Sequence, residues 1–151
     1  MLLLSGTLSA ETGGPSSEHT SNRRSIYLKV LRNTRDPLLD VFDAPETFSS
    51  VCSRNCTTTA AQALLMINGA QPLKNAAAMA EHLTKLDRSD YSSLIGEAYR
   101  MTYARQPTEA ERKWATDFLG KNAVPKKDKP DEKLIDFCHV LMNSNEFLFV
   151  D

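Results

Sequence analysis

The sequence predicts a mainly α protein: a compact bundle of about five helices with a loop-rich N-terminal third and at most one short two-stranded β pairing. Apolar residues recur at helical spacing in successive segments after residue 60, which is the main support for this fold class. Two capping boxes, Thr59 with Gln62 and Thr108 with Glu111, precede such segments. Each box pairs backbone N–H groups that the start of a helix leaves unsatisfied, so both mark helix N-termini.

The first predicted helix follows Thr59, and residues 60–67 are almost entirely apolar, so we expect this helix to be buried. Four more helices are expected: about 71–86, from Asp90 or Ser92 to Thr102, from Thr108 to Gly120, and from Asp131 to residues 143–145. The second and third of these form a hairpin. The side chains expected to face inward are Leu73, Ala76, Ala77, Ala80, Leu83, Leu86, Leu94, Ile95, Ala98, Tyr99, Met101, Thr102, Trp114, Ala115, Phe118, Leu119, Leu134, Ile135, Phe137, Cys138, Leu141 and Met142.

The N-terminal third is interpreted as two regions. Residues 1–22 are predicted to be a truncated helix end, closed by Gly6, followed by an exposed linker. Residues 23–151 are predicted to form a single helical domain. Residues 24–31 alternate in the manner of a strand, whose partner would be residues 147–150 or a strand in upstream sequence.

Charge and hydropathy exclude several classes of protein. Eighteen basic and nineteen acidic residues give a net charge of −1, which supplies no positive field for nucleic acid, so we expect no nucleic-acid partner. No segment approaches the roughly 20 apolar residues that span a bilayer, so no transmembrane segment is expected. The start lacks the basic region of a signal peptide, and the localisation of the chain is left open.

The most distinctive polar cluster surrounds the first helix and comprises Arg54, Asn55, Thr58, Thr59, Gln62 and Asn68. Free backbone donors and the helix dipole attract anions at a helix start, so these residues could form an anion pocket. They could equally brace the loop before the helix. We favour the structural role, because polar groups under an irregular loop must be paired.

A second candidate cluster consists of Cys52, Cys56, Cys138 and His139. Thiolates and an imidazole suit a tetrahedral zinc ion, and a local bridge between Cys52 and Cys56 is another interpretation. We favour unligated thiols. The haem-attachment motif Cys-x-x-Cys-His is incomplete, because Ile135 stands where its first Cys belongs, so no haem or other cofactor is expected in this chain.

Acidic residues gather in one loop: Asp36, Asp40, Asp43 and Glu46. Two carboxylates about 5 or 9 Å apart would suit glycoside hydrolysis, but proximity in sequence does not establish that separation. Solvated loop carboxylates are the commoner case. We therefore predict no catalytic residue.

Three ordered sets of residues carry a resemblance to a known family: Arg23-Arg24-Ser25-Ile26-Tyr27 with Phe42-Asp43-Ala44-Pro45; Arg54, Thr58-Thr59, Gln62-Ala63-Leu64 and Asn68; and Tyr99-Arg100 through Arg105-Gln106-Pro107-Thr108-Glu109, with residues 138–147. Over about residues 4–151 the chain resembles the planctomycete-specific C-terminal domain of unknown function called PSD-one. The resemblance implies a C-terminal fragment of a large, exported protein, periplasmic or at the cell surface, whose upstream part is cytochrome-c-like. Haem is then expected only in that upstream sequence.

From these observations we expect a non-catalytic accessory or interaction domain that packs against the upstream domains of its own full-length protein. The alternative is that residues 36–58 contribute to a hydrolytic or carbohydrate-binding site that those domains complete. The sequence leaves the substrate, the redox partner and the oligomeric state open.

Overall fold

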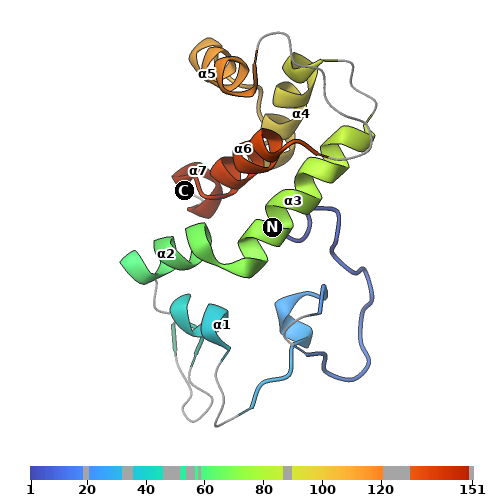
Figure 1. Cartoon of the computed structure of the whole chain (residues 1–151). Coiled ribbons are helices and arrows are strands. Elements are labelled where there is room, and N and C mark those ends of the chain that lie inside the picture. Colours follow the sequence, from blue (N-terminus) through green and yellow to red (C-terminus); the bar gives the residue numbers. More distant parts are fainter. Residues whose placement is uncertain are drawn as a thin grey trace. The chain divides into compact units, whose positions relative to one another are not determined.

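The structure, a computed structural model, describes residues 1–18, 21–31, 36–45, 52–53, 57, 59–86, 90–120 and 130–149. Over these residues the protein is mainly α, as predicted, with seven α-helices and almost no strand (Figure 1). The chain divides into two compact units. The helical unit is Met1–Thr7 with Gly69–Asp151, and the loop unit is Leu8–Asn68. The domain boundary predicted after residue 22 stays a prediction.

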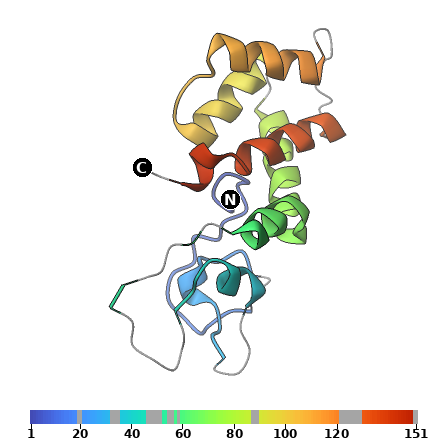
Figure 2. The ribbon, with the colours of Figure 1, turned by 90° about the vertical axis from the view of Figure 1, so that its left-hand side faces the viewer.

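The helical unit contains five helices: α3 (Ala70–Lys85), α4 (Tyr91–Tyr103), α5 (Glu109–Leu119), α6 (Glu132–Met142) and α7 (Asn145–Leu148). Helix α6 packs most extensively against α3 and also contacts α4, α5 and α7. Figures 1 and 2 show α6 in the middle of this unit, next to the pair formed by α4 and α5. The hairpin predicted from the sequence is this α4–α5 pair.

The apolar core of the helical unit draws on all four of its long helices. Phe137 of α6 and Met79 of α3 are fully buried at its centre, because the inward positions of each helix recur at intervals of three and four residues. Burial of each large side chain stabilises the fold by about 1.5–3 kcal/mol. The core residues are Ala76, Met79, Ala80, Leu83, Tyr91, Leu94, Ile95, Ala98, Tyr99, Ala115, Leu119, Leu134, Phe137, Cys138, Leu141 and Met142.

Four side chains that the periodicity placed in the core are exposed instead: Leu73, Leu86, Trp114 and Phe118. Leu73 lies in the first turn of α3, and Leu86 directly follows its last residue, so both lie at the ends of the helix. On α5, only Ala115 and Leu119 are buried. The rings of Trp114 and Phe118 stack on each other at 5.9 Å along the edge of the buried stripe. The apolar pattern of α5 is therefore wider than its contact surface.

The helix ends follow the local signals in the sequence. Asp90 caps α4 by accepting a hydrogen bond from the Ser93 N–H at 3.3 Å. Thr108 and Glu111 form the predicted capping box of α5. Residues 1–7 form a single turn that ends at Gly6, whose φ is +67°. The Thr7 N–H donates to Leu2 O and the Gly6 N–H to Leu3 O, which is the bond pattern of a glycine C-cap, as predicted.

The loop unit contains a 3-10 turn (Ser25–Tyr27) and two helices, α1 (Pro37–Val41) and α2 (Ala60–Asn68), which contact each other. The predicted strand over residues 24–31 is wrong. Its first part is the 3-10 turn, and Leu28 makes only an isolated parallel bridge with Ser17. The strand suggested for residues 147–150 is also wrong over its described part, because Ser144 caps helix α7, which includes Phe147.

A buried arginine organises the N-terminal loop of this unit. The Arg23 guanidinium donates to Pro15 O at 3.0 Å and to Gly13 O, and it lies 4.4 Å from the centre of the Tyr27 ring. Gly13 has a φ of +75°, a conformation that suits glycine. The resemblance motif that contains Arg23 and Tyr27 thus has a structural role in holding a loop.

Helix α2 does not show the complete burial that its composition predicts. Only Gln62 and Met66 are buried, whereas Leu64 and Ile67 are 60% and 53% exposed. The Gln62 side-chain amide donates to Val41 O of α1 at 2.9 Å. A polar contact therefore fixes which side of α2 faces inward, and most of its apolar surface faces outward.

Candidate functional site

The predicted anion cluster is only partly described. Arg54, Asn55 and Thr58 lie outside the described residues. Thr59 and Gln62 form the predicted capping box: the Gln62 N–H donates to Thr59 Oγ1 at 3.3 Å, and the Thr59 N–H donates to Gln62 Oε1 at 3.2 Å. Asn68 is the last residue of α2 and is exposed. The described side chains of Thr59 and Gln62 serve the helix start, and the anion pocket stays a prediction.

The acidic loop uses at least two of its carboxylates for structure. Asp36 accepts a hydrogen bond from the Leu39 N–H at 2.9 Å at the start of α1. Asp43, with a φ of +55°, accepts two hydrogen bonds from Thr57, at 2.8 Å from the N–H and 2.6 Å from the hydroxyl. Glu46 lies outside the described residues.

The thiol cluster is likewise only partly described. Cys52 is an exposed free thiol and Cys138 a buried one, while Cys56 lies outside the described residues. Burial raises the pKa of the Cys138 thiol, which keeps it protonated. Within the described ranges, no three His, Cys, Asp or Glu side chains come together as metal ligands would. The zinc set therefore stays a prediction, and the free thiol of Cys52 does not support a local bridge to Cys56.

A charged cluster that the sequence did not single out joins α5 to α7, and we call it the Arg105 cluster: Arg105, Glu111 and Glu146. The Arg105 guanidinium makes a bidentate pair with Glu111, at 2.9 and 2.8 Å, and another with Glu146, at 2.7 and 2.7 Å. Its fifth N–H donates to Gln106 O at 3.1 Å. All five guanidinium donors are therefore engaged.

Hydrogen bonds from Arg105 hold both carboxylates of the cluster in their ionised form. They lower the pKa of Glu111 to about 2, with further help from the Thr108 N–H, and they lower the pKa of Glu146. The two carboxylates in turn raise the pKa of Arg105. Two negative groups and one positive group leave the cluster with a net negative charge.

Two tyrosines form the aromatic side of this cluster. The guanidinium carbon of Arg105 lies 5.5 Å from the ring centre of Tyr99 and 5.4 Å from that of Tyr103. The Tyr103 hydroxyl lies 3.1 Å from Leu141 O and 2.9 Å from Ser144 Oγ, which links α4 to the start of α7. Desolvation and the nearby carboxylate of Glu111 raise the pKa of Tyr99 to about 12.

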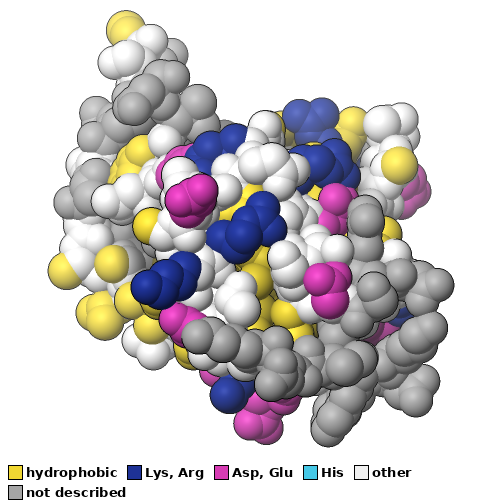
Figure 3. All heavy atoms as spheres, turned by 90° about the horizontal axis from the view of Figure 1, so that it is seen from above, with side chains coloured by type: hydrophobic (Ala, Val, Ile, Leu, Met, Phe, Trp, Pro, Cys, Tyr) yellow, Lys and Arg dark blue, Asp and Glu magenta, His cyan; other side chains and the backbone are white. Residues whose placement is uncertain are grey.

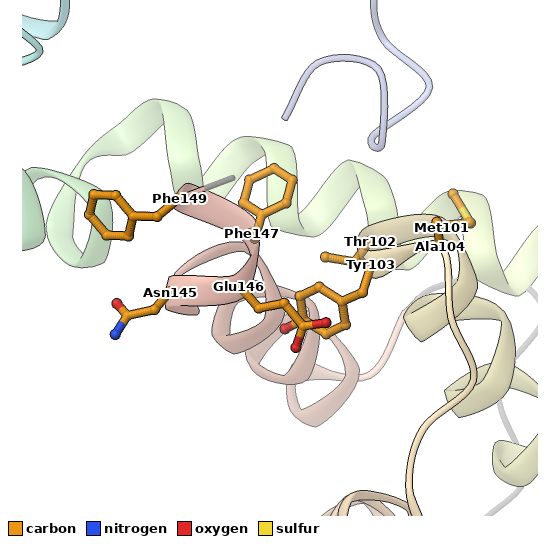
Figure 4. Close-up of a pocket in the computed structure, with 8 residues that line it drawn as sticks. All are labelled: Met101, Thr102, Tyr103, Ala104, Asn145, Glu146, Phe147 and Phe149. Atoms are coloured by element: carbon orange, nitrogen blue, oxygen red, sulfur yellow. The ribbon is translucent and has the colours of Figure 1, made fainter. Parts of the chain in front are cut away.

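An open groove of about 720 Å³ lies beside the Arg105 cluster, and we call it the α4–α7 groove. Its lining residues are Met101, Thr102, Tyr103, Ala104, Asn145, Glu146, Phe147 and Phe149. Figure 4 shows Glu146 reaching toward Tyr103, while Phe147 and Phe149 project from α7 and the residue that follows it. The groove is therefore largely apolar, with a carboxylate at its edge.

A smaller cavity of about 310 Å³ lies between α4 and the start of α5, lined by Ser92, Ser93, Gly96, Glu97, Gln106 and Arg112. Its cationic side chain already has a partner, because Arg112 donates to Ser92 Oγ at 3.3 Å. Glu97 pairs with Arg100 of its own helix. The cavity is polar, and the one acidic and the one basic side chain that line it each already have a partner.

The Arg105 cluster was missed as a site because only half of it has a sequence signal. Glu111 is the third residue of a capping-box helix, so a preceding arginine is well placed to reach it. Glu146 lies 41 positions from Arg105, and no local pattern connects the two. The third set of the resemblance contains both Arg105 and Glu146, but it does not contain Glu111, and nothing in it indicates that Arg105 and Glu146 pair.

Comparison with known proteins gives a family but no activity. No curated protein and no solved structure matches this chain. The family model PSD1, described as a protein of unknown function (DUF1553), matches residues 1–119. The match ends at the last residue of α5, so the resemblance proposed for residues 138–147 lies outside it. The chain belongs to the PSD1 (DUF1553) family.

Proposed function

We propose that this chain is a non-catalytic accessory domain that binds the upstream domains of its own full-length protein. The observation that carries the proposal is the exposed apolar stripe of α2, formed by Ala60, Ala63, Leu64 and Ile67. These residues share one helix face, since they are three and four positions apart. A helix with an outward apolar face suits a groove on a partner, where that face would become buried.

The rest of the loop unit supports the same conclusion. Ile26 and Val30 are 69% and 62% exposed. Among the described residues of this unit, Met66 is the one buried apolar side chain. A contiguous exposed apolar surface on a small protein marks an interaction site more often than chance. Covering the exposed parts of Leu64 and Ile67, which are 60% and 53% exposed, would contribute at most about 1–2 kcal/mol per side chain to binding.

The surface charge is compatible with a protein partner. Figure 3 shows basic and acidic side chains interspersed with apolar ones on one face of the molecule, with no large area of a single sign among the side chains coloured there. No described helix is both long enough and apolar enough to cross a bilayer. The partner that we propose is the one that the resemblance implies: the upstream, cytochrome-c-like part of an exported protein.

The test uses the polypeptide encoded directly upstream of the Met1 codon in the same reading frame. That polypeptide is produced separately and titrated with the purified chain in a calorimeter. We expect saturable binding, weakened about tenfold or more by Leu64→Ser combined with Ile67→Ser, because two apolar contacts are lost. Val140→Ser, at an equally exposed apolar position on α6, is the matched control and should bind like the unchanged chain.

Two outcomes would overturn the proposal. An in-frame stop codon directly upstream of the Met1 codon would remove the proposed partner. Equal binding by the α2 variant and the control would separate the interaction from the exposed stripe. The hydrolytic alternative stays a prediction, and the described roles of Asp36 and Asp43 in holding backbone N–H groups do not favour it.

A further inference from the structure

We propose that the α4–α7 groove binds a peptide segment that combines apolar side chains with a lysine or arginine. This goes beyond the proposed function, because it places a second binding surface on the helical unit and states the chemistry of its ligand. The shape and lining of the groove and the charge of the Arg105 cluster at its edge support this proposal.

The groove has apolar lining residues and a volume that suits a few side chains of a peptide. Met101 and Phe147 are partly buried against the core, and Phe149 is 47% exposed. Figure 4 shows both phenylalanine rings projecting from the backbone at the end of α7, away from the carboxylate of Glu146. A volume of about 720 Å³ lies within the range of pockets that hold a compact ligand, so it accommodates a few side chains of a peptide.

The charge at the edge of the groove selects a cation. Arg105 has no donor left for an incoming anion, because Glu111, Glu146 and the Gln106 carbonyl occupy all five of its N–H groups. A carboxylate has about four acceptor positions, so Glu146 retains capacity to accept from a lysine or arginine. Its side chain is 46% exposed and lines the groove, so a ligand can reach it.

The net negative charge of the Arg105 cluster also disfavours acidic ligands. With two carboxylates and one guanidinium, an approaching carboxylate meets net repulsion and no free donor from Arg105. The lowered pKa values of Glu111 and Glu146 keep both groups negative at neutral pH. Binding should therefore weaken as salt rises, because the attraction acts between partly exposed charges.

The test measures fluorescence anisotropy of a dye-labelled probe peptide, Gly-Leu-Lys-Phe-Lys-Leu-Gly, titrated with the full chain. Two comparison peptides replace both lysines with glutamate or with glutamine. We expect the lysine peptide to bind at least about fivefold tighter than the glutamine peptide and tighter still than the glutamate peptide. Raising the salt from about 50 to about 300 mM should reduce this preference.

Two variants assign the site, and each has a matched control. Phe149→Ala should weaken binding about fivefold or more, whereas Val140→Ala, which removes an equally exposed apolar side chain outside the groove, should not. Glu146→Gln should abolish the preference for lysine over glutamine, whereas Glu132→Gln should preserve it. Thermal melts identify any variant that is unfolded, and such a variant is replaced by Phe149→Ser or Glu146→Ser.

Three results would overturn the inference: no saturable binding of the lysine peptide up to about 1 mM, equal affinity for the glutamate peptide, or unchanged binding by both groove variants. The α2 variants of the proposed function are expected to bind the probe peptide normally. If the upstream polypeptide failed to bind, the peptide-binding result would therefore be unaffected. The two experiments thus distinguish failure of this inference from failure of the proposed function.

Discussion

Replacing Arg105 with alanine is expected to lower the free energy of unfolding of the helical unit by about 0.7–2 kcal/mol. The side chain is 35% exposed, so its ion pair with Glu111 is taken at the modest strength of surface pairs, about 0.2–1 kcal/mol. Contact with the rings of Tyr99 and Tyr103 adds about 0.5–1 kcal/mol. In a unit of this size the midpoint of thermal unfolding should fall by roughly 5–15 °C.

The assay is urea unfolding followed by the fluorescence of Trp114, the one tryptophan of the chain, with circular dichroism as a second probe. Arg105→Lys keeps the charge but loses the planar fork, so it should recover only part of the stability. Arg100→Ala is the matched control, because the ion pair of Arg100 is with Glu97 of its own helix and, among the described residues, connects it to no second element. The reasoning is refuted if Arg100→Ala costs as much stability as Arg105→Ala.

The same cluster predicts a dependence of stability on pH. The pKa of Glu111 is about 2 in the folded chain against an ordinary value of 4.5, so the folded state favours the ionised form. A lowered pKa contributes stability that is fully present above the ordinary value and is lost as the pH falls toward the folded value. The unchanged protein should therefore lose stability between about pH 4.5 and pH 2, and Arg105→Ala should show a shallower loss in that window.

Three further predictions concern the helical unit. Phe137→Ala should lower the free energy of unfolding, measured in urea, by about 3–5 kcal/mol, because it empties a fully buried position. Val140→Ala on the same helix should lower it by less than about 0.5 kcal/mol. Similar losses for both variants would contradict the assignment of Phe137 to the core. Ala104→Gly should stabilise the chain by up to about 1 kcal/mol, since Ala104 has a φ of +57° at the end of α4, and a loss of stability would argue against this conformation. In native protein, iodoacetamide should modify Cys52 readily and Cys138 only after unfolding, as peptide mass mapping can show; rapid labelling of Cys138 would contradict its burial.

The parts of the fold that short-range signals determine could be predicted from the sequence. Both capping boxes and the Gly6 turn depend on residues three to five positions apart, and all three have the expected hydrogen bonds. The segment at residues 147–150 shows how such a signal can outweigh composition. Its aromatic and branched residues favour a strand, but Ser144 caps a helix there by accepting from the Phe147 N–H.

The width of each buried face could not be predicted, because periodicity gives the direction of a helix face but not how much of it a neighbour covers. Trp114 and Phe118 continue the apolar stripe of α5 yet stack on each other at its exposed edge. On α2 an apolar composition predicted burial, but the Gln62 amide orients the helix through Val41 O. The Arg105–Glu146 pair spans 41 positions and arises only from tertiary packing.

The central claim is that the outward apolar face of α2 is a surface for binding the upstream part of the same protein. Hydrogen exchange of the chain, measured by mass spectrometry with and without the upstream polypeptide, tests it most directly. We predict slower exchange of the amides of residues 60–68 in the complex, with little change in α6, whose core positions are already buried. Unchanged exchange in α2 at saturating partner would contradict the claim.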